Sequence, residues 1–351
     1  MEITIDNIKT ALGKVVEPDL NKDIITLGLV DSLKFENNRI SFTVKVSNPA
    51  MHSKKRMEEA CEFALERAFG GGTKSDITVE ALPKDRDPTI RTILPNVKHI
   101  IAIASGKGGV GKSTITTNLA AGLAKKGYKV GLVDADIYGP SAPTMFDLVG
   151  QKPEGIEVNG KTLIKPLESY GVKILSIGFF SDPDQAVVWR GPMATKALNQ
   201  MFKDAHWGDL DYLLIDLPPG TGDIHLTLVQ NIPLTGAIIV STPQEVALAD
   251  ARKGINMFKM DTLKVPVIGL VENMAWFTPA ELPDNKYYIF GQDGAKNLAE
   301  SMNVPLLAQI PLIQSVREAG DVGRPAVLQE NTISSKIFDE FVSTIIKNVE
   351  A

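Results

Sequence analysis

The sequence contains a single cysteine, Cys61, and only four histidines among its 351 residues. One thiol excludes an intramolecular disulfide. So few cysteine and histidine side chains leave little material for a transition-metal site. The sequence also has no run of 18 or more apolar residues, which excludes a predicted membrane-spanning helix.

The sequence has no large excess of charge of either sign, since 37 basic residues face 42 acidic ones and the net charge is −5. Proteins that bind nucleic acids draw on clustered Lys and Arg, so we expect no nucleic-acid partner. Residues 1–6 lack the basic and apolar segments of a signal peptide. With 44% hydrophobic and 23% charged residues, the composition is that of a globular protein with a sizeable core. We therefore expect a cytoplasmic protein without stable membrane insertion.

Residues 1–84 predict a small α+β domain that contains Cys61. Cys61 lies on a helical stripe of apolar residues, and we expect it to be a core residue because free cysteine is among the most buried residue types. A charged, proline-rich stretch at 85–97 predicts an extended linker. The elements expected in the domain are a helix over 8–16, strands at 24–30 and 40–46, a helix over 54–69 ended by three glycines, and a strand at 77–79.

Residues 98–351 alternate short apolar runs with helical patterns. Runs without polar alternation are typical of strands buried on both faces. Alternation of strands and helices predicts an α/β fold with a doubly wound, mostly parallel sheet, whose ligands bind at the carboxyl ends of the strands. Residues 156–162 predict a hairpin added to this core. The expected strands are 100–104, 130–133, 172–177, 212–215, 237–240, 267–271 and 306–310.

The segment GKGGVGKS, from Gly106 to Ser113, matches the phosphate-binding pattern G-x-x-x-x-G-K-[ST] between a predicted strand and a predicted helix. Its backbone N–H groups and the helix N-terminus favour bound phosphates. We expect Lys112 to reach the β- and γ-phosphates, Ser113 to bind Mg²⁺ and Thr114 to hydrogen-bond the α-phosphate. The predicted nucleotide-binding residues of the loop are Gly106, Lys107, Gly108, Gly109, Val110, Gly111, Lys112, Ser113 and Thr114.

Carboxylates stand at the ends of two other predicted strands. Asp216 ends an apolar strand, as does the aspartate that holds Mg²⁺ in phosphate-loop enzymes, and the glycine-containing segment 217–223 after it suits a mobile switch. Asp136 follows the second strand of the core, where its side chain would orient water. A single aspartate at a strand end is equally typical of a helix cap or turn. The combination with the phosphate loop favours a nucleotide-hydrolysing site.

Several strings carry a resemblance to a known class. KGGVGKST with its second lysine, DADIYGPSAP, DLPPGTGD and ENM resemble the deviant-Walker, MinD-like ATPases (the SIMIBI class of P-loop NTPases), which includes ParA and the nitrogenase iron protein. Within this class, WRGPM and IPLIQSVREAGD are similar to the Mrp (ApbC-like) family of iron–sulfur cluster carriers. The likeness covers residues 98–351. Residues 1–84 resemble the iron–sulfur-assembly domain that precedes many bacterial members.

The resemblance implies a homodimer that binds ATP and Mg²⁺, hydrolyses ATP and transfers iron–sulfur clusters to apoproteins. Apoprotein clients or iron–sulfur assembly factors would be its further partners. Lys107 would reach the ATP of the other subunit, Asp136 would position the attacking water, and Asn273 would recognise adenine. A solvated loop lysine is the alternative for Lys107. The implied catalytic residues are Lys107, Lys112, Asp136 and Asp216, with Ser113 and Asp216 as ligands of Mg²⁺.

The sequence departs from this family at the cluster site. Many members carry a C-x-x-C pair shortly after ENM, but here Pro279 and Leu282 stand at those positions, and neither binds iron. An iron–sulfur cluster therefore remains possible by family, while its usual cysteine ligands are absent.

Two alternatives stay open beside the cluster carrier. One is a nucleotide-gated scaffold without a cluster. The other is a membrane-positioning switch like MinD or ParA, for which the apolar face of 333–349 is the best support. The polar face of that segment carries both signs of charge, which favours a helix packed on the protein.

Overall fold

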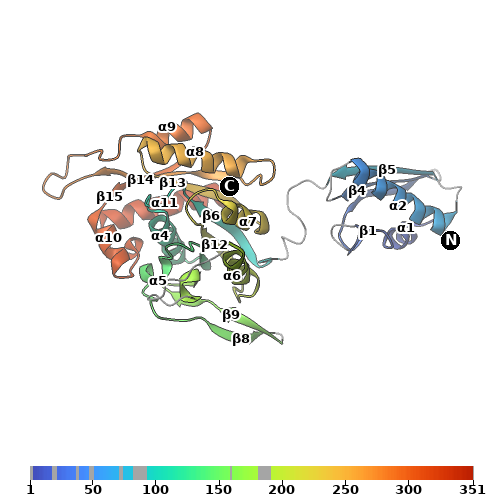
Figure 1. Ribbon diagram of the computed structural model, residues 1–351, viewed down its shortest axis with the longest axis horizontal. Coiled ribbons are helices and arrows are strands. Elements are labelled where there is room, and N and C mark those ends of the chain that lie inside the picture. The colour runs from blue at the N-terminus through green and yellow to red at the C-terminus, as the bar shows by residue number, and fades with distance from the viewer. Residues whose placement is uncertain are drawn as a thin grey trace. The chain divides into compact units, whose positions relative to one another are not determined.

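The computed structural model describes residues 3–17, 22–36, 39–46, 51–70, 74–81, 93–158, 160–180 and 191–350. The chain divides into two compact units, residues 1–91 and 92–351 (Figure 1). The predicted linker at 85–97 falls largely outside the described residues. The limits of the two domains and of the linker therefore stay a prediction.

The first unit is built on a three-stranded sheet. The strand order is β3-β4-β5, with β3 and β4 antiparallel and β4 and β5 parallel. A parallel pair needs a crossover connection, and α2 supplies it. Cys61 on α2 is buried in the apolar core, as predicted. The elements are α1 (Ile5–Leu12), β1 (Val16–Glu17), β2 (Lys22–Asp23), β3 (Val30–Glu36), β4 (Arg39–Val46), α2 (Met51–Phe69) and β5 (Lys74–Ala81).

Two details predicted for this unit are wrong. The segment expected as a strand at 24–30 is a turn up to Gly28, and β3 begins only at Val30. The turn is fixed by Asp23, whose carboxylate accepts the N–H of Thr26 at 2.8 Å, and by the left-handed φ of 64° at Gly28. The first helix ends at Leu12, so Val16 lies in β1 and is exposed.

The second unit is an eight-stranded sheet in which every neighbouring pair is parallel except the edge pair β10–β11. All seven predicted strands are confirmed. The sequence pattern missed β10 because three residues show no recognisable period. In sheet order the strands are β10 (Leu167–Ser169), β11 (Val172–Ser176), β7 (Val130–Asp134), β12 (Leu210–Asp216), β6 (Val97–Ala104), β13 (Gly236–Ser241), β14 (Val267–Phe277) and β15 (Leu306–Leu312).

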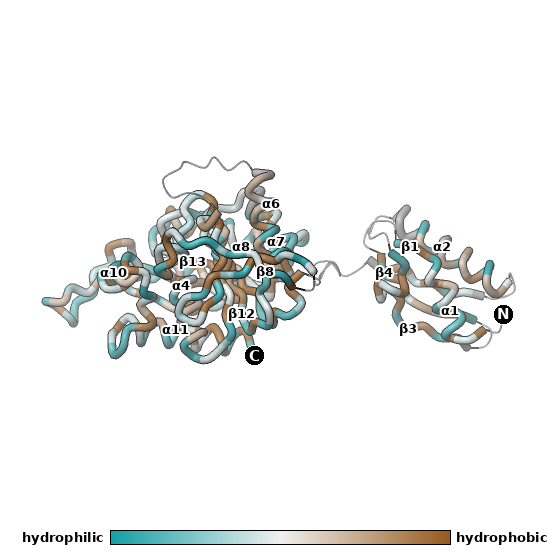
Figure 2. Tube along the Cα trace, turned by 90° about the horizontal axis from the view of Figure 1, so that it is seen from below, coloured by the Kyte–Doolittle hydropathy of each residue, from teal (hydrophilic) through white to brown (hydrophobic). Residues whose placement is uncertain are grey.

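Helices cover both faces of this sheet, as in a doubly wound fold (Figure 1). On one face α4 (Lys112–Lys125) and α11 (Ile333–Glu350) pack onto the strands, and α5 (Ala142–Met145) and α10 (Gln314–Asp321) lie beside them. The other face carries α6 (Gly191–Lys203), α7 (Asp223–Asn231), α8 (Glu245–Lys259) and α9 (Gly294–Met302). The central strands form the hydrophobic interior (Figure 2). The predicted hairpin is confirmed as β8 (Glu154–Val158) and β9 (Lys161–Lys165).

The C-terminal helix α11 is packed on the protein, as the mixed charge of its polar face predicted. Phe338, Phe341 and Ile345 on its apolar side are buried in the core shared with α4. Gly122 of α4 permits this contact, because a Cβ there would lie only 2.6 Å from Cγ2 of Val342. The middle of the apolar face of α11, residues 338–345, is thus covered by its own protein, whereas Ile333 at its start is exposed. No helix among the described residues is long and apolar enough to span a membrane.

Candidate phosphate-binding site

The loop between β6 and α4 needs glycine at several positions. Gly109 and Gly111 have left-handed φ values of 80° and 83°, which side chains disfavour. At Gly106 the reason is space, since a Cβ there would lie 2.2 Å from the carbonyl carbon of Asp250 in α8. The loop leads directly into the N-terminus of α4 at Lys112. Such a loop followed by a helix N-terminus is a favourable site for phosphate groups.

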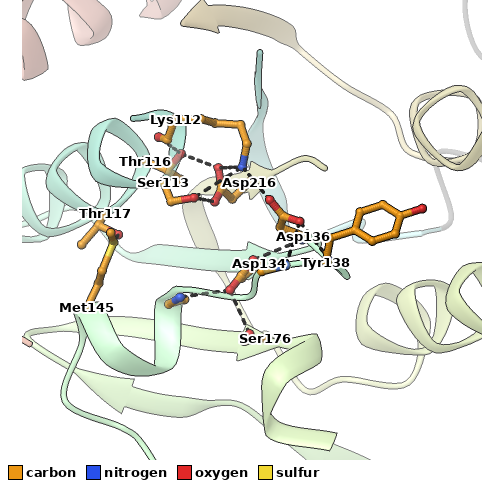
Figure 3. A network of polar contacts seen from close by, with 12 residues as sticks. Lys112, Ser113, Thr116, Thr117, Asp134, Asp136, Tyr138, Met145, Ser176 and Asp216 are labelled. Atoms are coloured by element: carbon orange, nitrogen blue, oxygen red, sulfur yellow. Dashed lines mark hydrogen bonds and ion pairs between the residues drawn. The ribbon is translucent and has the colours of Figure 1, made fainter. Parts of the chain in front are cut away.

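Three of the predicted catalytic residues meet at the end of this loop (Figure 3). The Lys112 ammonium lies 2.8 Å from Oδ1 of Asp216 and 3.7 Å from Oδ2 of Asp136. Ser113 donates to Oδ2 of Asp216 at 2.6 Å. The hydroxyl of Thr116, one turn further along α4, lies 2.9 Å from Oδ1 of Asp216. No sequence pattern selects Thr116, because its contact with Asp216 depends on the approach of β12 to α4.

Asp134 is a third carboxylate of the site, and sequence reasoning assigned it no role. It is the last residue of β7, is fully buried, and lies beside Asp216 in the register of β7 and β12. Burial, and then the charge of Asp216, raise the pKa of Asp134 above its ordinary value. Its carboxylate accepts hydrogen bonds from Ser176 Oγ at 2.9 Å and from the N–H of Ala142 at 3.0 Å. Its position two residues before Asp136 was the only sequence signal.

The carboxylate of Asp136 is held by the turn that follows it. Oδ1 accepts the backbone N–H groups of Tyr138 at 3.2 Å and Gly139 at 3.3 Å. The other oxygen is the one that faces Lys112. Asp136 is 9% exposed, so most of its surface is buried. This turn is of the kind that aspartate commonly forms with the residues after it.

Asn273 contacts the phosphate loop itself. Its Nδ2 donates to the carbonyl of Val110 at 2.9 Å, and a Cβ at Gly111 would lie 2.2 Å from the same nitrogen. The preceding residue, Glu272, is fully buried and accepts the N–H of Ala295 at 2.6 Å. Asn273 therefore holds the loop against β14. Its predicted part in adenine recognition stays a prediction.

Lys107 in the loop and Thr114 in the helix form no hydrogen bond or ion pair with this network within the described part of the chain. The side chain of Lys107 is half-buried and forms no ion pair or hydrogen bond with any residue that the structure describes. Thr114 lies in the first turn of α4, where its carbonyl accepts the side chain of Asn118. The positions of both are compatible with contacts to a bound nucleotide.

The residues present fit Mg²⁺. Ser113 Oγ and the Asp216 carboxylate are hard oxygen ligands and lie together at the point where the β- and γ-phosphates would approach. They do not fit an iron–sulfur cluster. Within the described part of the chain, no group of three His, Cys, Asp or Glu side chains is placed to hold a metal ion. Cys61 is buried in the other unit, and burial raises the pKa of its thiol to about 12, which disfavours the thiolate that iron requires.

The segment that replaces the usual cysteine pair forms an arm after β14. The arm turns back on itself, since Phe277 and Tyr287 pair across it, and the Lys286 ammonium lies 4.0 Å from the centre of the Trp276 ring. Leu282, at one of the two expected cysteine positions, is 48% exposed. The arm thus presents apolar and aromatic side chains and, as the sequence shows, contains no thiol.

Comparison with known proteins agrees with this geometry. The family model of NUBPL iron-transfer P-loop NTPases, a ParA-type model, matches residues 96–349, and the model of iron–sulfur cluster assembly proteins matches residues 5–79. An iron–sulfur cluster carrier protein of Synechocystis is 42% identical over 349 residues, covering 99% of this chain and 98% of the relative. One from Escherichia coli is 53% identical over 321 residues, covering 90% of this chain and 84% of the relative.

Solved structures show the same fold for the second unit. A nucleotide-binding protein from Archaeoglobus fulgidus in complex with ADP is 36% identical, with a TM-score of 0.60 over 72% of this chain and 97% of its own. The cell-division ATPase MinD of Pyrococcus furiosus shares the fold at 23% identity and a TM-score of 0.50, over 71% of this chain and 98% of its own. The chain belongs to the family of NUBPL iron-transfer P-loop NTPases, with an iron–sulfur cluster assembly domain ahead of the NTPase domain.

Proposed function

We propose that this protein is a Mg²⁺-dependent ATPase that works in the cytoplasm as a homodimer in iron–sulfur cluster delivery. The observation that carries the proposal is the convergence of Lys112, Ser113, Asp136 and Asp216 at the end of the phosphate loop. Lys112 would bind the β- and γ-phosphates, and Ser113 with Asp216 would hold Mg²⁺. Bound Mg²⁺ supplies positive charge that offsets the charge of the phosphates.

Hydrolysis would proceed by attack of a water oxygen on the γ-phosphorus. The bond from that phosphorus to the bridging oxygen breaks, ADP leaves with the bond's electron pair, and the proton of the water passes to the released phosphate. Asp136 would orient this water, which is supported by the turn that fixes one of its oxygens and by the other oxygen facing Lys112. Positioning of this kind is the main protein contribution to phosphoryl transfer.

Lys107 of the partner subunit would complete the site. In this chain Lys107 is half-buried and has no ion pair within the described residues, so its charge is available to another group. A cation delivered across a dimer interface stabilises charge that develops in the transition state, as an arginine finger does. The active form would therefore be a dimer in which each loop serves both subunits.

Iron–sulfur clusters would be the cargo, as the names of the relatives from Synechocystis and Escherichia coli imply. The arm after β14 has no thiols, and Cys61 is buried with a raised pKa. Clusters usually need four cysteine ligands, so the ligands here would come largely from the partner protein or from glutathione. The protein would then assist transfer without being the main holder of the cluster.

A second candidate function is a nucleotide-gated scaffold that binds no cluster. The specific observation in its favour is the replacement of the cysteine pair by Pro279 and the exposed Leu282. Both candidates share the ATPase site and differ only in cargo.

Two measurements on the purified full chain test the proposal. Steady-state hydrolysis of ATP with and without Mg²⁺ tests the enzyme, and a protein that binds ATP but does not turn it over contradicts it. Anaerobic reconstitution with Fe²⁺, sulfide and glutathione, followed by transfer to an apo-ferredoxin, tests the cargo. Cluster absorbance that persists in Cys61→Ser supports ligands from outside the chain. Active ATPase with no absorbance and no transfer favours the scaffold.

A further inference from the structure

Ser176 links the edge of the sheet to the candidate catalytic centre. It is the last residue of β11, lies opposite Asp134 in the register with β7, and is fully buried. Its hydroxyl accepts the N–H of Gly178 at 3.0 Å and donates to Oδ2 of Asp134 at 2.9 Å. A hydroxyl that accepts one bond and donates another has a fixed orientation, so Ser176 is a defined donor to Asp134.

Asp134 in turn closes the loop that carries Asp136. Oδ1 accepts the N–H of Asp136 at 3.2 Å, where the loop starts, and Oδ2 accepts the N–H of Ala142 at 3.0 Å, where α5 begins. One buried carboxylate therefore fixes both ends of residues 136–141. The donor from Ser176 is the only one of these three that comes from outside this loop and α5.

The network ends at Lys112. Asp136 directs one oxygen to the turn after it and the other towards the Lys112 ammonium at 3.7 Å. The direction of that carboxylate depends on its backbone, which Asp134 holds. A continuous series of polar contacts thus runs from Ser176 through Asp134 and Asp136 to Lys112 (Figure 3).

We propose that Ser176 is a positioning residue for ATP hydrolysis, which acts on Asp136 through Asp134. This inference rests on the proposed ATPase function. Without the Ser176 hydroxyl, Asp134 keeps two donors on the loop and loses the one that ties it to β11. A buried carboxylate that loses a donor shifts to recover one, and the loop moves with it. Because displacement of about 1 Å in a catalytic group can cost about 100-fold in rate, turnover is the quantity that responds.

Nucleotide affinity depends on other residues. The phosphate loop and Lys112 would bind the phosphates, whereas the Ser176 hydroxyl bonds to Asp134 and Gly178. Removal of the hydroxyl should therefore lower kcat and leave binding of ATP close to that of the wild type. A purely structural serine would instead lower the amount of folded protein, so that the number of ATP-binding sites falls in proportion to the apparent kcat and kcat per binding site stays unchanged.

The experiment compares Ser176→Ala with Ser334→Ala in the full chain. Ser334 is also buried, but it lies on α11 and bonds only near that helix, so it controls for loss of a buried hydroxyl. We expect kcat to fall by about tenfold or more in Ser176→Ala, with Kd for Mg²⁺-ATP within about twofold. Ser334→Ala should keep the wild-type kcat. A wild-type kcat in Ser176→Ala, or an equal fall in both variants, overturns the proposal.

A double-mutant cycle with Asp134→Ala tests the route. If Ser176 acts only through Asp134, then the double variant should have the kcat of Asp134→Ala alone, because the carboxylate that accepts the Ser176 hydroxyl is already gone. Losses that multiply would contradict this route. The proposed function is tested separately. A wild type that binds ATP without hydrolysing it contradicts both the ATPase function and this inference. An active wild type with an unaffected kcat in Ser176→Ala contradicts the inference alone.

Discussion

The Lys112 ammonium lies 2.8 Å from Oδ1 of Asp216, and the two side chains are only 5% and 4% exposed. The lysine that should bind phosphate is thus paired with the carboxylate that should bind Mg²⁺. Ser113 is bonded to the same carboxylate. Mg²⁺-ATP would replace this internal ion pair with two new ones, phosphate on Lys112 and metal on Asp216. The buried charges of Lys112 and Asp216 therefore compensate each other, which limits the desolvation free energy that their burial costs.

This exchange predicts the behaviour of Asp216→Asn. The variant frees Lys112 from its carboxylate, so affinity for ATP without Mg²⁺ should stay at or above that of the wild type. Hydrolysis should fall by about 100-fold or more because the metal ligand is gone. Titration of a fluorescent ATP analogue with and without Mg²⁺, beside turnover, measures both. Asp211→Asn is the matched control on the same strand, where Asp211 pairs with the exposed Lys98. If Asp216→Asn loses ATP binding in the absence of Mg²⁺ and Asp211→Asn does not, the result contradicts the proposed exchange of ion pairs.

The two lysines of the loop should differ in their effects. Lys112→Ala should lower ATP affinity by about 100-fold or more, since the cation nearest the phosphates is lost. Lys107→Ala should keep most of the affinity and lower kcat, because contacts made only in the transition state act on rate. Equal losses of affinity and rate in Lys107→Ala would contradict its assignment.

Mixing these two impaired variants tests whether Lys107 acts across the dimer. A Lys107→Ala subunit keeps Lys112 in its own site and would receive Lys107 from a Lys112→Ala subunit. At an ATP concentration where each variant alone turns over slowly, we therefore expect the mixture to regain part of the ATPase activity. Heterodimers that form, as shown by differently tagged subunits, yet remain inactive would place Lys107 in its own subunit's site.

The contact of Gly106 with α8 predicts a difference between two neighbouring glycines. In Gly106→Ala the new Cβ would meet the backbone of Asp250 at 2.2 Å, so the loop or the helix must shift. Overpacking of this kind costs about 1–3 kcal/mol. Gly108→Ala meets no atom within 4 Å and is the control. Thermal unfolding should show a fall of about 2–4 °C per kcal/mol for Gly106→Ala only. Similar Tm values for the two variants would show that the close approach to α8 has no consequence.

His225 predicts a dependence of stability on pH. It lies on α7 and is 2% exposed, and Phe258 packs against it with ring centres 6.0 Å apart. Neither ring nitrogen has a hydrogen-bond partner among the residues that the structure describes. Burial, and then the charge of Lys112, lower its pKa to about 4, and the nearby carbonyl of Pro218 opposes this only weakly. The unfolded chain takes up a proton near pH 6.5 that the folded chain refuses. Stability should therefore fall as the pH drops from about 6.5 to about 4.

The lowered pKa of His225 corresponds to a loss of about 3 kcal/mol in the free energy of unfolding as the pH falls from about 6.5 to about 4. Urea unfolding of the wild type and of His225→Phe at several pH values measures it. The free energy of unfolding of the wild type should decrease relative to the variant between pH 6.5 and 4. Parallel curves would mean that His225 accepts a proton in the folded protein as readily as in the unfolded chain.

The sequence predicted most of the fold because local patterns carried the information. Unbroken apolar runs located all seven core strands, and the spacing of glycines with Lys112 and Ser113 located the phosphate loop. Predictions of secondary structure were wrong where a specific side-chain contact decided the local conformation. The turn after Asp23, for example, is apolar enough to be a strand, but a side-chain hydrogen bond and a left-handed glycine hold it as a turn.

By itself, the sequence determined the chemical parts of this protein: a phosphate loop, carboxylates at strand ends, and an arm without thiols. Only the tertiary structure decided which parts meet. The sheet order places β11, β7, β12 and β6 side by side, so that Ser176, Asp134 and Asp216 follow one another across adjacent strands, although 40 or more residues separate them in the chain. The approach of Asn273 to Val110 has the same origin. Periodicity encodes the conformation and burial of each segment, whereas the pairing of strands, which depends on the packing of the whole core, sets the neighbours of each side chain.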